Sequence, residues 1–132
     1  MNIRKFVVPW SIAVGAMDAV TGLLLVMVPA LILQLLGIAP PSGEALVFVS
    51  WIGVFVTGVG LSYAMVLVDR RSAKTVWMIT AMLRGLVAAY VAWRIADGSL
   101  VPVWAMVALT DSVVAMVQIA VVRSSGWKEE HR

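Results

Sequence analysis

The chain has 132 residues, of which 62% are hydrophobic and 13% are charged, and its mean hydropathy is +1.00. Soluble domains average about 45–50% apolar and about 25% charged residues, so this composition excludes an ordinary water-soluble domain. Cysteine is absent, which removes disulfides, thiolate nucleophiles and Cys-ligated metal centres, and the formal charge of +3 is better explained by membrane orientation than by nucleic-acid binding.

Four apolar runs follow one another along the chain, at residues 6–28, 45–68, 75–95 and 101–122. Each is close to the roughly 20 residues that an α-helix needs to cross the hydrocarbon core of a bilayer. Because the segments between them are short, consecutive helices are expected to be antiparallel neighbours. The sequence therefore predicts an all-α fold in which residues 1–132 form one integral membrane domain, an antiparallel four-helix bundle.

Pro29 falls where the first run reaches the far surface of the bilayer. Two alternatives are open for the following residues up to residue 36. They form a kinked extension along the interface before the Pro40-Pro41 turn, or they complete one long tilted helix. Either way the first helix is expected to be uncleaved, because its apolar run exceeds the roughly 7–15 residues of a signal-peptide core.

Lysine and arginine outside the runs, or at their very ends, gather on one side of the predicted membrane. Arg94 alone is placed on the opposite side, whereas the main group comprises Arg4, Lys5, Arg70, Arg71, Lys74, Arg123, Lys128 and Arg132. Under the positive-inside rule, both termini and the loop at residues 69–74 are cytoplasmic. With no recognised organelle address, the expected location is the bacterial inner (cytoplasmic) membrane, which the chain crosses four times.

Each run also carries small or mildly polar residues at helical spacing, the type that lets membrane helices approach closely. These stripes are Ser11, Gly15, Asp18 and Gly22; Gly53, Thr57, Gly60 and Ala64; Ala81, Arg84, Ala88 and Ala92; and Ala108, Asp111, Ala115 and Gln118. Tryptophan lies near the ends of the runs, at Trp10, Trp51, Trp77, Trp93, Trp104 and Trp127. The stripes are expected to face one another, and the tryptophans are expected to anchor the helices in the headgroup layer.

Three ionisable residues, Asp18, Arg84 and Asp111, interrupt the apolar runs at mid-membrane depth. At 1.5 Å of rise per residue they lie about 18, 14 and 17 Å from the cytoplasmic ends of their helices, and Thr57 falls at a similar depth. An unpaired charge at such depth costs about 2.5–3.5 kcal/mol even on the lenient insertion scale. Because one planar guanidinium can hold two carboxylates, we predict that Arg84 bridges Asp18 and Asp111.

The predicted Asp–Arg–Asp cluster carries a net charge of −1 when both aspartates are ionised. Either one carboxyl is then protonated, or a cation, a ligand amine or a water cluster supplies the balance. Two interpretations stay open at this point. The cluster is structural and fixes the register of the helices, or it is a functional site such as a proton relay or a ligand site.

Residues 22–37, with the sequence GLLLVMVPALILQLLG, resemble the first-helix segment of small bacterial four-helix membrane proteins of the DoxX-like type. The short loops and the tail containing tryptophan and lysine extend the resemblance over most of the chain. It implies the same four-helix membrane fold and transfers no catalytic residue.

The leading hypothesis is a non-enzymatic bundle that serves as a subunit or assembly partner of a larger membrane complex. One alternative is a small proton-coupled transporter, or a lipid or amphiphile binder, that uses Asp18 and Asp111 across Arg84. Another is an intramembrane acid–base enzyme such as an isomerase. His131, the single histidine, lies in the charged tail, so no buried haem or metal ligand and no cofactor are expected. The expected partners are the lipid bilayer, a membrane protein or second copy, and a lipid or hydrophobic small molecule, with no nucleic acid.

Overall fold

The computed structural model describes residues 3–124, and the regular secondary structure of these residues is helical. Trp127 and His131 lie outside the described residues. In chain order the elements are α1 (Ile3–Met27), α2 (Pro29–Leu35), α3 (Glu44–Ser62), α4 (Ala64–Val68), the short 3₁₀ helix η1 (Arg70–Ser72), α5 (Ala73–Ala96), the 3₁₀ helix η2 (Pro102–Trp104) and α6 (Ala105–Arg123).

Four stretches of these helices are long and apolar enough to cross a membrane. They are Lys5–Met27, Glu44–Val68, Arg70–Ala96 and Pro102–Arg123. Their bounds lie within one residue of the predicted runs, except that the third begins five residues earlier, at residue 70 instead of 75. The all-α class is therefore confirmed, and the four predicted spans correspond to helices whose length and composition suit a membrane protein.

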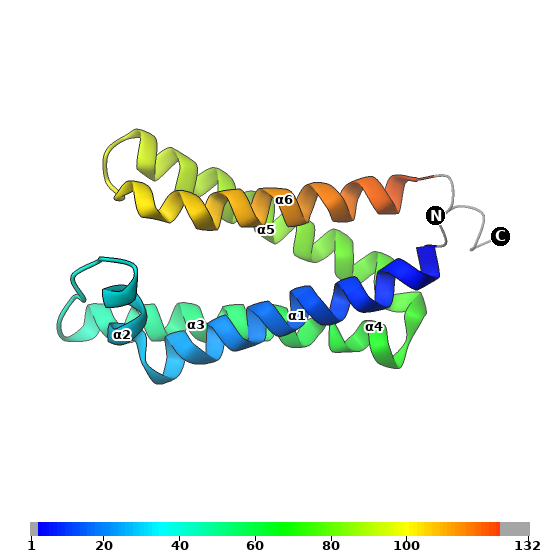
Figure 1. Cartoon of the computed structure of the whole chain (residues 1–132), viewed down its shortest axis with the longest axis horizontal. Helices are drawn as coiled ribbons and strands as arrows, with labels where there is room; N and C mark the ends of the chain where they lie inside the picture. Colours follow the sequence, from blue (N-terminus) through cyan, green and yellow to red (C-terminus); the bar gives the residue numbers. More distant parts are fainter. Residues whose placement is uncertain (1–2, 125–132) are drawn as a thin grey trace. The chain divides into compact units, whose positions relative to one another are not determined.

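The first span ends at a break in front of Pro29. Val28 has φ −140° and ψ 51°, outside the helical region, because a residue that precedes proline is sterically driven out of that region. Pro29 then starts α2, where its missing N–H costs nothing. The chain leaves α2 through Gly37, whose φ of 73° closes a Schellman turn with the Ile38 amide donating to the Leu33 carbonyl at 2.9 Å. The structure therefore agrees with the kinked extension and not with one long helix: the helix is interrupted before Pro29, and α2 is not collinear with α1 (Figure 1).

The chain divides into two compact units. The N-terminal unit is Val8–Arg70, which contains most of α1 together with α2, α3 and α4. The C-terminal unit is Arg71–Arg132 together with Met1–Val7, and its main elements are α5 and α6. The single closed bundle expected from the sequence stays a prediction.

In the N-terminal unit, α1 and α3 pack antiparallel through glycines. A methyl group built on Gly60 would lie 2.4 Å from the backbone nitrogen of Ala19, and one on Gly53 would lie 2.7 Å from the Gly22 carbonyl oxygen. Side chains at these positions would overlap with backbone atoms, so the two helices can approach this closely only where both carry small residues. The spacing is the same in the two helices, at residues 15, 19 and 22 of α1 and residues 53, 57 and 60 of α3.

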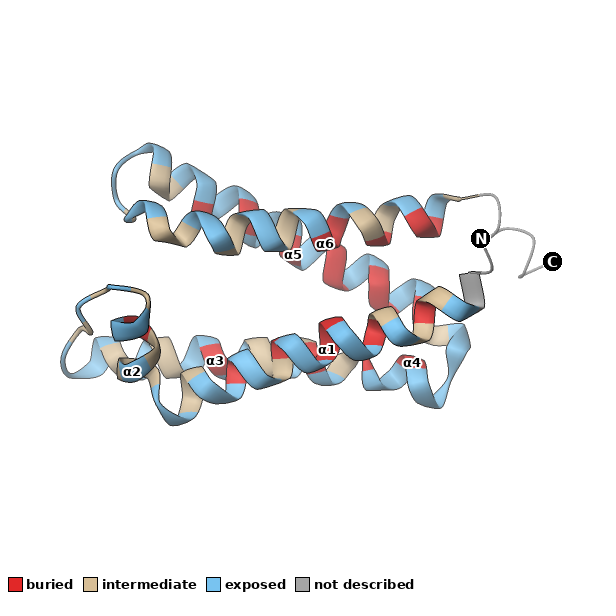
Figure 2. Cartoon of the chain, in the orientation of Figure 1, coloured by how far each residue is buried: buried red, intermediate tan, exposed pale blue. Residues whose placement is uncertain are grey.

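In the C-terminal unit, α5 and α6 form an antiparallel hairpin that packs along the lengths of both helices (Figure 1). The turn begins at Gly98, which has a φ of 78° and lets the Ser99 amide donate to the Arg94 carbonyl at 2.9 Å. Buried residues recur every three or four positions along one side of each helix (Figure 2). In α5 they are Ala73, Val76, Trp77, Thr80, Ala81, Arg84, Ala88 and Val91, and in α6 they are Val114, Ala115, Gln118, Val121 and Val122.

Trp77 differs from the expected headgroup anchor. Its side chain is fully buried, and its ring meets that of Phe6 edge-on at 6.4 Å between centroids. Trp51 and Trp93, in contrast, expose 56% and 60% of their surface. The anchoring role expected for Trp77 is therefore wrong, because this tryptophan packs inside the protein.

Candidate functional site

The hairpin of the C-terminal unit holds an ion pair between Arg84 of α5 and Asp111 of α6. The Arg84 Nη1 group donates a hydrogen bond to the Asp111 Oδ1 atom. The side chains expose 6% and 15% of their surface, so the contact is largely removed from the surroundings. The predicted pairing of Arg84 with Asp111 is present.

The turn between the helices explains why these two residues meet. Residues 84 and 111 are each about 13 positions from the Asp97-Gly98 turn, and residues equally distant from a tight turn face each other in an antiparallel hairpin. Arginine suits the position because its guanidinium stays protonated and presents several donors in one plane. The equal spacing of the two residues from the turn therefore explains why Arg84 and Asp111 lie opposite each other.

A second polar contact joins the same two helices. The Gln118 Nε2 group donates to the Thr80 hydroxyl oxygen at 3.3 Å, and that hydroxyl donates in turn to the Val76 carbonyl at 2.8 Å. Both side chains are buried. Gln118 is one of the stripe residues of the fourth run, whereas Thr80 was not singled out from the sequence. The sequence signal that identifies Thr80 is its position four residues before Arg84, which places both on the same face of the helix.

Asp18 belongs to the N-terminal unit, where it is buried with 7% of its surface exposed. It lies on α1 between Gly15 and Gly22, near the face that packs against α3. A buried carboxylate in a membrane-spanning helix is costly and needs a compensating interaction. The predicted pairing of Asp18 with Arg84 stays a prediction.

Thr57 takes part in the packing of α1 against α3. Its hydroxyl donates to the Gly53 carbonyl at 2.8 Å, and a methyl group on Gly22 would lie 2.4 Å from both its amide nitrogen and its hydroxyl oxygen. The Thr57 hydroxyl thus donates its hydrogen bond within α3. Within the N-terminal unit, Thr57 acts as a small packing residue, and its predicted membership of the central polar layer stays a prediction.

The turn after α5 carries a separate, exposed ion pair. Arg94 Nη1 contacts Asp97 Oδ2 at 2.8 Å, and the Ser99 amide donates to Asp97 Oδ1 at 2.9 Å. Hydrogen bonds from the Ser99 hydroxyl and amide, followed by the charge of Arg94, hold the pKa of Asp97 below its ordinary value. The Arg94 guanidinium is therefore paired with a carboxylate, and it also lies 5.5 Å from the centre of the Trp93 ring.

Among residues 3–124, no three histidine, cysteine, aspartate or glutamate side chains come together in a group that could hold a metal ion. The candidate site of this part of the chain is the Arg84–Asp111 pair with its neighbouring amide–hydroxyl contact, and buried Asp18 is a separate polar residue of the N-terminal unit. Compared with models of known protein families, with curated proteins and with solved structures, the chain matches none of them.

Proposed function

We propose that the chain is a non-enzymatic integral membrane protein that serves as a subunit or assembly partner of a larger membrane complex. In this proposal its four helices form an antiparallel bundle in the bacterial inner membrane, with both termini in the cytoplasm. The observation that carries the proposal is the Arg84–Asp111 ion pair buried within a single hairpin.

The pair supports a structural use of the intramembrane charges. Each charge alone would cost about 2.5–3.5 kcal/mol at the centre of the bilayer, and pairing inside one hairpin removes most of that cost. A transporter presents charge to its cargo, whereas here the guanidinium is turned toward a carboxylate of the next helix. The simplest role for such a pair is to fix the register of α5 against α6.

Asp18 extends this proposal to the whole bundle. We include in it the second contact of Arg84 predicted from the sequence, with Asp18, so that one guanidinium would hold two carboxylates. The support is the burial of Asp18, its depth along α1 and the capacity of arginine to hold two carboxylates. The proposal also includes the resemblance to DoxX-like membrane proteins, which concerns the four-helix fold.

Lateral contact with a partner is supported by the outward face of α3. This face carries three neighbouring aromatic rings, tilted to one another with centroids 6.1 and 6.0 Å apart, from Phe48, Trp51 and Phe55, and each exposes more than half of its surface. They lie opposite Gly53 and Gly60, which pack against α1. Within a bilayer such a ridge contacts either lipid tails or a helix of another protein.

Copurification tests the proposal. A tagged full-length chain is extracted in a gentle detergent, and its partners are identified by mass spectrometry beside a Trp51→Leu/Phe55→Leu variant that keeps the face apolar but removes the rings. We expect a stoichiometric membrane protein with the wild-type chain and its loss with the variant. A monodisperse homo-oligomer without any other protein would overturn the assembly role.

A second candidate function is a small proton-coupled transporter or a binder of lipids or amphiphiles. It is favoured by Asp111, whose side chain keeps 15% exposure while Arg84 contacts one of its two oxygens. The remaining oxygen could then take a proton or a ligand amine. Separate Asp18→Asn and Asp111→Asn variants test this candidate through pH-dependent transport or binding, and an unchanged response in both would remove it.

A further inference from the structure

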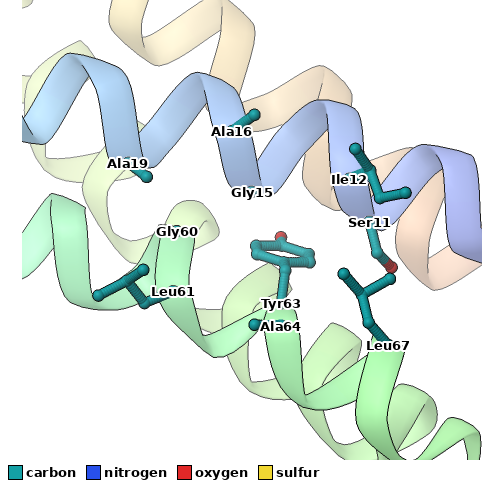
Figure 3. Close-up of a pocket in the computed structure, with 10 residues that line it drawn as sticks. All are labelled: Ser11, Ile12, Gly15, Ala16, Ala19, Gly60, Leu61, Tyr63, Ala64 and Leu67. Carbon is teal, nitrogen blue, oxygen red and sulfur yellow. The ribbon is translucent and has the colours of Figure 1, made fainter.

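The N-terminal unit contains an apolar groove of about 210 Å³ between α1 and the α3–α4 segment (Figure 3). Its floor is formed by Gly15, Gly60 and the buried Tyr63. The two glycines let α1 and α3 come into backbone contact at this floor, and the groove lies beside that contact. A methyl group on Gly15 would already lie 2.8 Å from the Tyr63 Cβ atom.

The walls of the groove alternate small and long apolar side chains. Ile12 stands on α1, and Leu61 and Leu67 stand on the opposite segment, each with about half or more of its surface exposed. Between them Ala16 and Ala64 leave the space open (Figure 3). The groove is therefore apolar, unfilled and flanked by aliphatic side chains, and these properties suit a flexible hydrocarbon chain.

The direction of the groove follows from the antiparallel packing of its two sides. Ile12 lies at the same end as Leu67, and Ala19 lies at the other end beside Gly60 (Figure 3). Seven residues of helix separate Ile12 from Ala19, which corresponds to about 10 Å along the axis. Since the span that contains Leu67 ends at Val68, the groove runs from the edge of the membrane into its interior.

Positive charge follows the outer end of the groove along the chain. Arg70, which belongs to the same unit, follows Leu67 by three residues and is exposed. In the sequence, residues 69–74 contain three basic residues and one acidic residue, a sum of +2. Basic residues at the edge of a membrane span attract anionic headgroups, and arginine binds phosphate through two parallel hydrogen bonds.

We propose that this groove binds one acyl chain of an anionic phospholipid, whose phosphate is held at Arg70. The lipid belongs to the leaflet that borders residues 69–74. Two independent features support this occupant: an apolar channel aligned with the lipid tails, and a positive charge at the end where the headgroup would lie. The inference is separate from the assembly role, because it uses neither Arg84, Asp111 nor the aromatic face of α3.

Lipid retention by the full-length chain tests the proposal. The delipidated protein in detergent receives equal amounts of phosphatidylglycerol and phosphatidylcholine with identical acyl chains, and bound lipid is counted by native mass spectrometry. We expect the wild-type chain to retain the anionic lipid in preference. Arg70→Gln should lower that preference about fivefold, whereas Arg94→Gln, a change at the exposed turn after α5, should leave it unchanged.

Filling the groove gives a second, independent readout. Ala64→Phe and, separately, Ala16→Phe place a ring in the channel and should reduce retention of both lipids. Ala89→Phe, at an exposed position of α5 outside the groove, is the matched control and should bind as the wild type does.

Two results would overturn the proposal. The first is that the wild-type chain retains the two lipids equally. The second is that Ala64→Phe and Ala16→Phe, shown by circular dichroism to be folded, retain as much lipid as the wild-type chain. If the groove variants fail to fold, the Arg70→Gln result decides, because that surface change leaves the channel intact.

Discussion

Gly22 of α1 and Thr57 of α3 are packed so closely that a methyl group on Gly22 would lie 2.4 Å from the Thr57 amide nitrogen. Backbone atoms cannot move aside as the end of a flexible side chain can, so the helices must separate to admit even one carbon atom. We expect Gly22→Ala to destabilise the chain by about 1–3 kcal/mol, measured by unfolding in a graded detergent mixture.

Gly58 provides the matched control for this prediction. It lies on the same α3 helix as Thr57, but a methyl group there would meet nothing within 4 Å. Gly58→Ala should therefore be neutral or stabilise the helix by up to about 1 kcal/mol, because alanine is the better helix former. Equal losses of stability in the two variants would contradict the close α1–α3 contact.

Removing one partner of the Arg84–Asp111 pair should be far more damaging than removing both. Arg84→Leu leaves Asp111 buried without its cation, and we expect a loss of about 3–5 kcal/mol in the free energy of unfolding. The double variant Arg84→Leu/Asp111→Leu should recover much of this loss. Arg94→Gln, in the exposed pair with Asp97, should change stability by less than about 1 kcal/mol. Equal stability of the Arg84 single and double variants would argue against a coupled pair.

The proposed contact between Asp18 and Arg84 predicts a different pattern in the same series. If Arg84 also holds Asp18, the double variant still leaves one buried carboxylate, and the recovery is incomplete. Adding Asp18→Leu as a third substitution should then restore stability by about 2.5–3.5 kcal/mol. If the triple variant is no more stable than the double variant, Asp18 does not contact Arg84.

The hydrogen bond between Gln118 and Thr80 should contribute modestly to the hairpin. Thr80→Val keeps the shape of the side chain but removes the hydroxyl, and we expect a loss of about 0.6 kcal/mol, the average for such bonds between membrane helices. Thr110→Val is the control, because the Thr110 hydroxyl donates at 2.8 Å to the Met106 carbonyl of its own helix. A larger loss for Thr110→Val than for Thr80→Val would contradict the assignment.

The turn after α5 should show a pH dependence of known sign. The pKa of Asp97 is lower in the folded chain than the ordinary 3.8, so its ionised form is favoured by folding. This contribution is present above the ordinary value and disappears as the pH falls through the lower, folded-state value. Ser99→Ala removes the hydroxyl that is the main cause and should raise the pKa of Asp97, measured by carbon-13 NMR of the labelled carboxyl. Ser124→Ala, remote from this turn in the sequence, should leave it unchanged.

The absence of cysteine from the chain makes its proposed orientation easy to test. Ser42→Cys lies in the exposed connection between α2 and α3, and Ser124→Cys lies just after α6. In intact spheroplasts, an impermeant maleimide should label the first and should reach the second only after permeabilisation. The reverse pattern would show that the termini face away from the cytoplasm.

Hydropathy was sufficient to locate the four spans, because the requirement for about 20 apolar residues leaves little freedom in where a helix can cross a bilayer. The Arg84–Asp111 pair was also predictable, since one short turn relates two residues that both need a partner. Thr80 is harder to predict, because its place one turn before Arg84 is a weak signal and a helical threonine, such as Thr110, commonly donates to a carbonyl of its own helix. Trp77 was misjudged for a related reason: tryptophan near the end of a span usually faces the headgroups, and only the contact with Phe6 reveals its burial.

The symmetrical placement of Arg84 and Asp111 about one turn also bears on how the chain enters the membrane during synthesis. If α5 left the translocation channel alone, it would carry an unpaired guanidinium into the lipid, and α6 alone would carry an unpaired carboxylate. Entering together as a folded hairpin, the two helices bring these groups to the same depth already paired. Membrane entry is therefore least costly when α5 and α6 enter together with the ion pair already formed.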